Sequence, residues 1–319
     1  MTSLSARRAR GSRLADSVFR GSTRLFAAAI IVVLVAIAGL LIVSSRLTWQ
    51  TFGLSFLTGT TWDPVAGVFG ALPFVVGTLV TAALAMVIAA PIGVATAIFL
   101  AELAPAWLAV PLGFLVELLA AIPSVVIGLW GVFVLSPVLR STIEDWLANT
   151  VGTVIPLFAG PTFGVGIFAA GIILAIMVLP TIVSISREVL RAVPESQREA
   201  MLALGATRWE TVARAVVPFA RSGIIGALIL GLGRALGETM AVTMVIGNNP
   251  QIPTRLFDQG QTISSQIATT FNEASIGLQT SSLIALGLTL LAMTIALNVI
   301  ARLLVRRVAG DGGGLASAG

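Results

Sequence analysis

The sequence predicts an all-α polytopic membrane protein with six transmembrane helices. Of its 319 residues, 57% are hydrophobic and only 10% are charged, whereas soluble chains have about 45–50% and about 25%. Apolar runs long enough to cross a bilayer core of about 30 Å recur along the chain. The arginines lie in blocks between these runs, which is the pattern that orients membrane spans.

The chain begins with a segment that we expect to be a basic cytoplasmic N-terminus, residues 1–24, with six arginines and a single acid. A charge-free run over 25–43 follows, about 28 Å long as a helix. It is too long for the apolar part of a signal peptide and leads into Ser44-Ser45-Arg46 without a good cleavage site. We interpret it as a retained first span.

Two further spans follow an outer loop at 46–70. The second span is predicted over about Ala71–Leu100, and the third over about Ala109–Leu135 with a break at Pro123. The polar stretch 137–163 is expected to form a second outer loop.

The second half of the chain contains the remaining three spans. The fourth is predicted over about Gly164–Ser184, the fifth over about Gly223–Ile246 and the sixth over about Ser282–Ala301. The charged stretch 186–222 separates the fourth from the fifth, and we expect a flexible tail over 306–319.

The distribution of arginine predicts the orientation. If both termini are cytoplasmic, fifteen of the 19 basic residues, all arginine, lie inside, and only Arg46, Arg140 and Arg255 lie outside. The opposite orientation violates the positive-inside rule. We therefore expect a multi-pass protein of the plasma membrane, surrounded by lipid and without a nucleic-acid partner.

The missing residue types exclude several functions. The chain has no Lys, so it cannot contain a Walker A loop, and it has no Cys or His. Disulfides, thiolate or imidazole metal sites and histidine-based catalysis are therefore excluded. We expect neither catalytic residues nor a bound cofactor or metal on this chain, and any ATP chemistry must occur on another chain.

The cytoplasmic stretch carries local signals for helix, sharp turn, helix. Pro194 suits a first helical position, Gly205 can adopt positive φ at the end of that helix, and Thr207 with Glu210 forms a capping box for a second helix. This arrangement exposes apolar residues, namely Met201, Leu202, Leu204 and Trp209. They either pack onto the protein's own helix ends or bind a soluble partner.

The same stretch resembles the EAA loop of ABC importer permeases. The matching positions are Glu199-Ala200-Met201, then Gly205, then Val217-Pro218. The resemblance implies a coupling helix that docks on an ATPase subunit, which carries ATP and Mg. The residues assigned to coupling are Glu199, Ala200, Met201, Leu204, Gly205 and Trp209.

The resemblance extends over 71–305 and implies a type I ABC importer permease core plus an extra N-terminal helix. The motifs are Gly77-Thr78-Leu79, Ala90-Pro91-Ile92-Gly93, Ala101-Glu102, Ile122-Pro123-Ser124-Val125-Val126, Gly128-Leu129 and the run from Gly231 to Met244. Among these permeases the chain is similar to the phosphate-uptake (Pst) family, and to its C subunit. That family implies a heterodimer with the paralogous A subunit, an ATPase homodimer and an extracytoplasmic phosphate-binding protein.

Two charges fall within the predicted fifth span. Arg234 and Glu238 are four residues apart, hence on one face of a continuous helix, and each charge costs about 2.5–3.5 kcal/mol at the bilayer centre. They form either a structural ion pair or part of the substrate path, and the resemblance favours the path. Gly233 and Gly237 suit close helix packing. The role of Glu117 is left open.

Three other functions compete with phosphate import. The chain could serve another oxyanion, such as molybdate or sulfate. A stand-alone secondary transporter would need no coupling helix and often shows internal repeats, of which we find none convincing. An enzyme acting on lipid-linked substrates would need a cluster of acids with metal-ligand spacing, which the spans lack.

Overall fold

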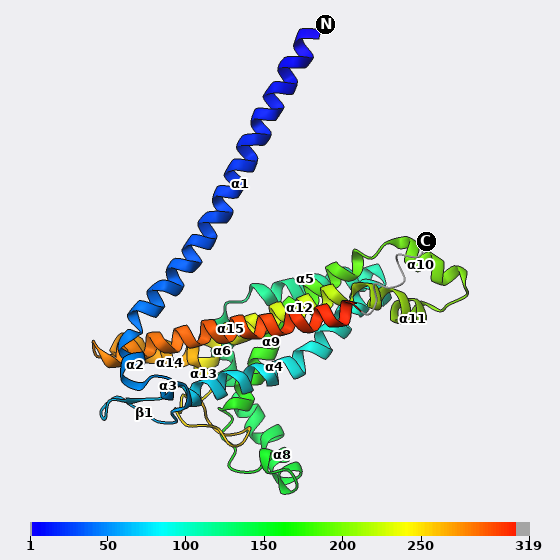
Figure 1. Ribbon diagram of the computed structural model, residues 1–319. Coiled ribbons are helices and arrows are strands. Elements are labelled where there is room, and N and C mark those ends of the chain that lie inside the picture. Colours follow the sequence, from blue (N-terminus) through cyan, green and yellow to red (C-terminus); the bar gives the residue numbers. More distant parts are fainter. Residues whose placement is uncertain (1, 311–319) are drawn as a thin grey trace.

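A computed structural model describes the backbone of residues 2–310 and the side chains of residues 19–303 (Figure 1). Within these residues, six helical stretches are long and apolar enough to cross a membrane. Their bounds are Phe19–Ser44, Leu72–Leu103, Ser124–Thr153, Ile167–Arg191, Arg208–Gly237 and Leu278–Leu303. The predicted fold class, an all-α protein with six spans, is confirmed.

The spans are assembled from α-helices and short π-helical and 3-10 segments, with one small β-hairpin at one end of the bundle. The regular elements, in chain order, are α1 (Thr2–Ser44), α2 (Arg46–Phe52), α3 (Ser55–Thr58), β1 (Trp62–Asp63), β2 (Val68–Phe69), α4 (Leu72–Ile98), α5 (Ala106–Ala121), α6 (Ser124–Trp130), α7 (Ser136–Val138), α8 (Asp145–Asn149), α9 (Ile167–Arg191), α10 (Glu195–Ala203), α11 (Arg208–Thr211), α12 (Val217–Gly237), α13 (Met240–Val245), α14 (Ile263–Thr270) and α15 (Leu278–Gly310). The π-helical segments are Phe99–Leu103, Gly131–Leu135, Leu139–Glu144 and Val212–Val216, and the 3-10 turns are Val151–Thr153, Pro156–Phe158 and Phe271–Glu273.

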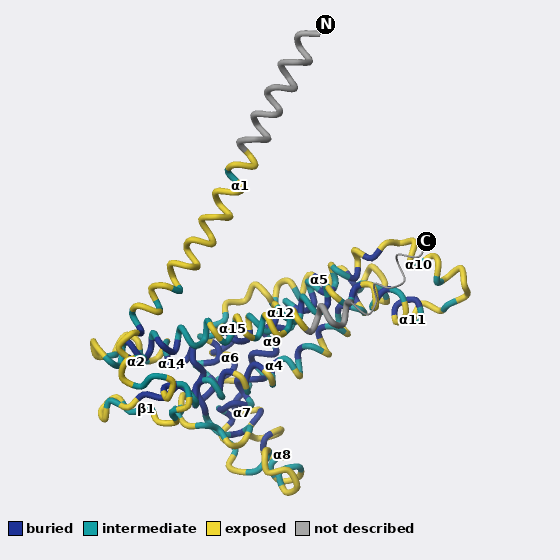
Figure 2. The backbone as a smooth tube through the Cα atoms, in the orientation of Figure 1, coloured by how far each residue is buried: buried dark blue, intermediate teal, exposed yellow. Residues whose placement is uncertain are grey.

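Helix α1 projects away from the other helices (Figure 1). It contacts α2 and α15, and its apolar side chains from Leu25 to Val43 are mostly exposed (Figure 2). Such a surface requires cover by lipid or by another apolar chain. The basic N-terminal segment continues into the first span as one helix, because the helical backbone starts at Thr2.

The main core lies where α4 and α9 pack side by side with α12 and α13. Small residues allow this close approach, among them Ala82, Ala85 and Ala89 on α4. A Cβ added to Gly93 would lie 2.8 Å from Cγ2 of Ile182 on α9. Helix α9 is the most deeply buried of the six spans (Figure 2).

Two smaller apolar clusters lie at the ends of the bundle. At one end, the antiparallel hairpin pairs Trp62 with Phe69, and these rings pack beside Phe74, α14 and α15. At the opposite end, buried residues of α4, α9, α12 and the segments next to them form the second cluster, which includes Ala97, Leu190, Val193, Val216, Ala220 and Ile224.

The predicted break at Pro123 is confirmed, but the predicted bounds of the third span, Ala109–Leu135, are wrong: the stretch long enough to cross a membrane is Ser124–Thr153, and Ala106–Ala121 is a separate shorter helix. Helix α5 ends at Ala121, Ile122 is extended with φ −67° and ψ 128°, and α6 begins after Pro123. Proline disfavours the helical conformation of the residue before it. From Ser124 the helical path continues to Thr153 and turns across the long axis of the bundle to α8 (Figure 1), so most of the first half of the predicted outer loop 137–163 is helical.

The fourth, fifth and sixth spans also differ from the prediction. Helix α9 reaches Arg191, and a helical path with a π-helical turn at Val212–Val216 joins Arg208 to Gly237. The wide turn precedes Pro218, which cannot donate a helical hydrogen bond. In the sixth span, α15 continues beyond the predicted end at Ala301 as far as Gly310. The predicted flexible tail is therefore helical over 306–310, and its remainder lies outside the described residues.

Candidate functional site

The charged stretch 186–222 contains the predicted helix, turn and helix. Helix α10 begins after Pro194, which is its N-cap rather than its first residue. Gly205 has φ +82°, a conformation that favours glycine. Thr207 caps α11: its amide donates to Glu210 Oε2 at 2.9 Å, and the Glu210 amide donates to Thr207 Oγ1 at 3.3 Å. We call residues 195–211 the coupling element.

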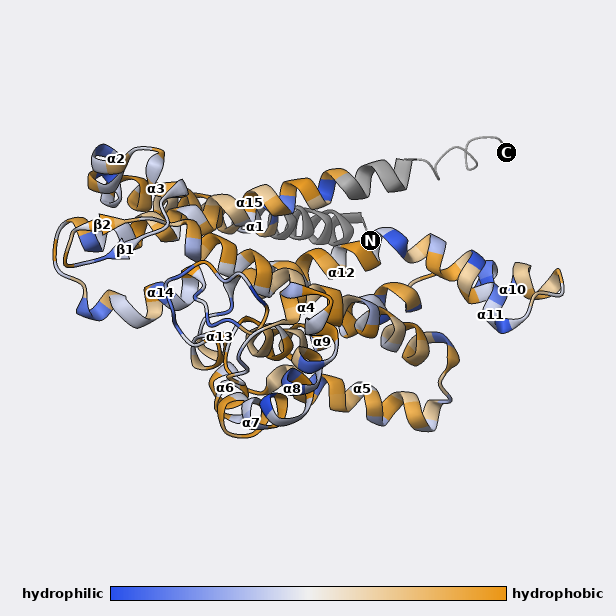
Figure 3. Ribbon diagram, turned by 90° about the horizontal axis from the view of Figure 1, so that it is seen from below, coloured by the Kyte–Doolittle hydropathy of each residue, from blue (hydrophilic) through white to orange (hydrophobic). Residues whose placement is uncertain are grey.

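Three large apolar residues of the coupling element are exposed. Leu204 is 83% exposed and Trp209 is 63% exposed, and Leu202 is exposed as well. Glu199 and Ala200 are exposed, while Met201 is partly buried. The alternative that Leu204 and Trp209 pack onto the protein's own helix ends is therefore wrong. Figure 3 shows α10 and α11 projecting from one end of the bundle, which leaves them accessible to another protein.

An arginine that the sequence analysis did not single out holds the coupling element to the bundle. Arg198 donates to both oxygens of Glu102, from Nη2 at 2.7 Å and from Nε at 3.2 Å. It also donates to the carbonyl oxygens of Val193 at 2.6 Å and Leu190 at 3.0 Å. Its side chain is 15% exposed and that of Glu102 is 9% exposed. We call this arrangement the Arg198 clamp; it ties α10 to the π-helical segment that follows α4 and to the C-terminal end of α9.

The clamp also changes the pKa of its arginine. Its hydrogen bonds to Glu102 raise the pKa of Arg198, so the guanidinium remains charged although it is largely buried. Two signals in the sequence point to Glu102: it ends a long stretch without any charge, and it belongs to the Ala101-Glu102 motif of the resemblance. Its partner lies 96 residues away, and no local pattern connects the two.

The two intramembrane charges do not lie on one helix. Helix α12 ends at Gly237, and Glu238 is extended, with φ −66° and ψ 131°. The interpretation of one continuous helix face is therefore wrong. Glycine is a poor helix former, and the break is stabilised by Ser264, whose hydroxyl donates to the Glu238 carbonyl oxygen at 2.8 Å.

Arg234 and Glu238 also do not pair with each other. Arg234 is exposed, and its Nη1 donates to Thr181 Oγ1 of α9 at 3.3 Å. The Glu238 carboxylate accepts a long hydrogen bond of 3.4 Å from the Ala241 amide at the start of α13. No ion pair joins Arg234 to Glu238 among the residues whose side chains are described. The structure therefore gives no support to a structural clamp between these two charges.

The face of α12 near Arg234 is open. A Cβ added to Gly226, Gly233 or Gly237 would meet nothing within 4 Å, and Leu230 is exposed. The small residues at 233 and 237 therefore pack against no other helix within the described part of this chain. An open apolar face beside a charge suits either a second subunit or a substrate path.

Comparison with known proteins identifies the family. Residues 93–310 match the family described as "Binding-protein-dependent transport system inner membrane component". The phosphate transport system permease protein PstC of Mesorhizobium japonicum is 47% identical over 92% of this chain and 91% of its own length. The PstC protein of Haemophilus influenzae is 45% identical over 92% of this chain and 94% of its own length.

More distant relatives agree. The PstC 2 protein of Mycobacterium tuberculosis is 39% identical over 92% of both chains. A subunit of a bacterial ABC transporter involved in alginate import superimposes with a TM-score of 0.53 over 82% of this chain and 90% of its own, at 17% identity. That likeness concerns the fold alone.

These matches cover both candidate sites. Membership in such a transport system implies an ATPase and a binding protein as partners, and a multi-pass location in the inner membrane. The matched family is one of permeases rather than of catalytic subunits. The chain belongs to the binding-protein-dependent inner membrane components and, within them, to the PstC family of phosphate transport system permeases.

Proposed function

We propose that this chain is a permease subunit of an ATP-driven importer that moves inorganic phosphate across the plasma membrane. The observation that carries the proposal is the identity of 45–47% to phosphate transport permeases over 92% of the chain. The family match over residues 93–310 includes the coupling element, Arg234 and Glu238. Another oxyanion, such as molybdate or sulfate, is the alternative cargo.

The proposed assembly contains two permeases and an ATPase homodimer, together with an extracytoplasmic phosphate-binding protein. The exposed apolar tip of the coupling element supports docking on an ATPase, and the open face of α12 supports pairing with the paralogous permease. ATP and Mg belong to the ATPase in this proposal, and the permease itself holds no cofactor. Both termini lie in the cytoplasm, as the arginine distribution predicts.

Arg234 and Glu238 are the proposed contacts in the phosphate path. A guanidinium offers planar paired donors to an oxyanion and stays charged when partly dehydrated. Arg234 makes only one hydrogen bond to a neutral hydroxyl within the described residues, so its other donors remain available. Glu238 can accept a hydrogen bond from a protonated phosphate oxygen, which sulfate does not offer at neutral pH.

The test is uptake by the complete transporter in proteoliposomes. We expect ATP-dependent uptake of radiolabelled phosphate that excess phosphate suppresses and that sulfate and molybdate do not. Equal competition by sulfate or molybdate would contradict the proposed cargo, and uptake without the ATPase would favour a stand-alone secondary transporter. Arg234→Gln should reduce uptake at least tenfold while the complex still assembles, whereas Arg255→Gln in the outer loop serves as a control. Normal uptake by Arg234→Gln would remove this residue from the path.

A further inference from the structure

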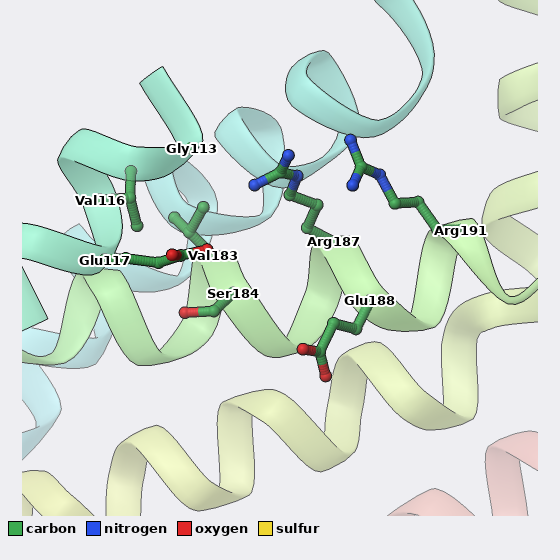
Figure 4. Close-up of a pocket in the computed structure, with 8 residues that line it drawn as sticks. All are labelled: Gly113, Val116, Glu117, Val183, Ser184, Arg187, Glu188 and Arg191. Carbon is green, nitrogen blue, oxygen red and sulfur yellow. The ribbon is translucent and has the colours of Figure 1, made fainter. Parts of the chain in front are cut away.

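A cavity of about 170 Å³ lies between α5 and α9, apart from both sites described above. That volume is well above the roughly 10–15 Å³ that one water needs. Figure 4 shows the residues that line it, which are Gly113, Val116, Glu117, Val183, Ser184, Arg187, Glu188 and Arg191. Glu117, whose role the sequence leaves open, is thus one wall of this cavity. Arg191 is the last residue of α9, so the cavity lies at the inner end of that helix.

The position of the Arg187 side chain requires a glycine opposite it, Gly113 of α5. A Cβ added to Gly113 would lie 2.9 Å from Arg187 Cζ and closer still to Nη1. The guanidinium therefore lies directly against the backbone of α5. Its Nε is buried and has no hydrogen-bond partner among the described residues, and a buried donor left without a partner costs about 1–3 kcal/mol.

Two arginines reach the same side of the cavity without a counter-charge. Arg187 and Arg191 are one helical turn apart, and their guanidinium groups point the same way in Figure 4, whereas Glu188 points the opposite way. Among the described side chains, no carboxylate oxygen lies within 4 Å of either guanidinium. Glu117 lies beside Val183, away from both guanidinium groups in this view. The pair is therefore available to an external anion.

We propose that Arg187 and Arg191 bind the phosphate group of an anionic phospholipid of the inner leaflet. Phosphate is a tetrahedral oxyanion that paired guanidinium donors recognise. Basic pockets between transmembrane helices on the cytoplasmic side are suited to such head groups. The surface of α5 beside the cavity also fits acyl chains, because Val110, Phe114 and Leu118 are exposed along it. The assignment to the inner leaflet rests on the proposed orientation.

Lipid binding by the purified, delipidated transporter complex tests this proposal. Native mass spectrometry would measure binding of phosphatidylglycerol and of phosphatidylcholine to the wild type and to Arg187→Gln/Arg191→Gln. We expect the double variant to bind phosphatidylglycerol at least tenfold more weakly, with phosphatidylcholine unchanged. Arg214→Gln/Arg302→Gln is the matched control, because it removes the same two positive charges from exposed residues. Gly113→Ala should weaken binding without any change in charge, since it displaces the guanidinium.

Two outcomes would overturn the proposal. Unchanged phosphatidylglycerol binding in the double variant would exclude the arginines as its site. Binding of inorganic phosphate but not of phosphatidylglycerol by the wild type, with loss of the phosphate binding in Arg187→Gln, would assign the cavity to the free anion instead. Phosphate uptake by the wild-type transporter is measured in parallel. Uptake tests the proposed transport function and lipid binding tests the proposed lipid site, so either proposal can fail while the other holds.

Discussion

The substitution Glu102→Gln tests how much the ionic interaction between Glu102 and Arg198 contributes to the Arg198 clamp. The substitution keeps the shape of the side chain and one carbonyl oxygen, but it removes the negative charge that Arg198 faces at 2.7 Å. Because both side chains are largely buried, water cannot replace the lost interaction without opening the structure. Hydrogen bonds that involve a charged group contribute about 1.5–3 kcal/mol, and breaking a fully buried pair costs about 3–5 kcal/mol.

The lower range applies here, because Arg198 keeps its two carbonyl acceptors, those of Leu190 and Val193. A loss of about 1.5–3 kcal/mol makes local opening of α10 roughly ten- to hundredfold more frequent. We expect faster amide hydrogen exchange in α10 than in the wild-type complex. ATP hydrolysis should continue, and the number of phosphate ions moved per ATP should fall.

Glu195→Gln provides the matched control. Glu195 lies 3.6 Å from the same guanidinium but is 77% exposed, and exposed pairs stabilise little. Exchanging the charges, with Glu102→Arg and Arg198→Glu, should not restore coupling, because the new carboxylate would face two carbonyl oxygens. Unchanged hydrogen exchange and unchanged stoichiometry in Glu102→Gln would refute the reasoning, and so would full rescue by the exchange.

Two other predictions concern the turn and the orientation. Gly205→Val should strain a backbone held at φ +82° by about 1–3 kcal/mol and reduce co-purification of the ATPase; normal co-purification and uptake would argue against docking through this turn. Reporter fusions after residues 60 and 262 should be extracytoplasmic and one after residue 205 cytoplasmic, and a cytoplasmic signal at 262 would contradict the proposed topology.

Local signals predicted the coupling element well, because each of its decisive features depends on neighbouring residues. Gly205 adopts the expected positive φ, and Thr207 and Glu210 form the expected capping box. The predicted start of α10 was wrong by one residue at Pro194. The exposure of Leu204 and Trp209 could not be predicted from the sequence, because an apolar side chain in a loop can be either buried or exposed. Only the structure shows that both are exposed.

Distant polar partners explain the larger errors. Charges at Arg140, Glu144 and Asp145 indicated a loop, yet Glu144 is buried in a helical path and accepts a hydrogen bond from the Gly164 amide at 2.9 Å. Apolar composition indicated one helix through Glu238, yet the chain breaks there and Ser264 stabilises the break. Membrane proteins tolerate such breaks where other parts of the protein satisfy the freed polar groups. These partners are 20 and 26 residues away, beyond any helical periodicity.

Helix α9 connects the two proposed sites physically. Near its C-terminal end, the carbonyl oxygen of Leu190 accepts a hydrogen bond from Arg198, and nearer its centre the Thr181 hydroxyl accepts one from Arg234. Close packing against α4 at Gly93 restricts independent sliding of the two helices, because the contact is already tight. A force applied by an ATPase to α10 would therefore act on α4 and α9 together. The bond from Thr181 to Arg234 would then carry any displacement of α9 to the proposed phosphate path.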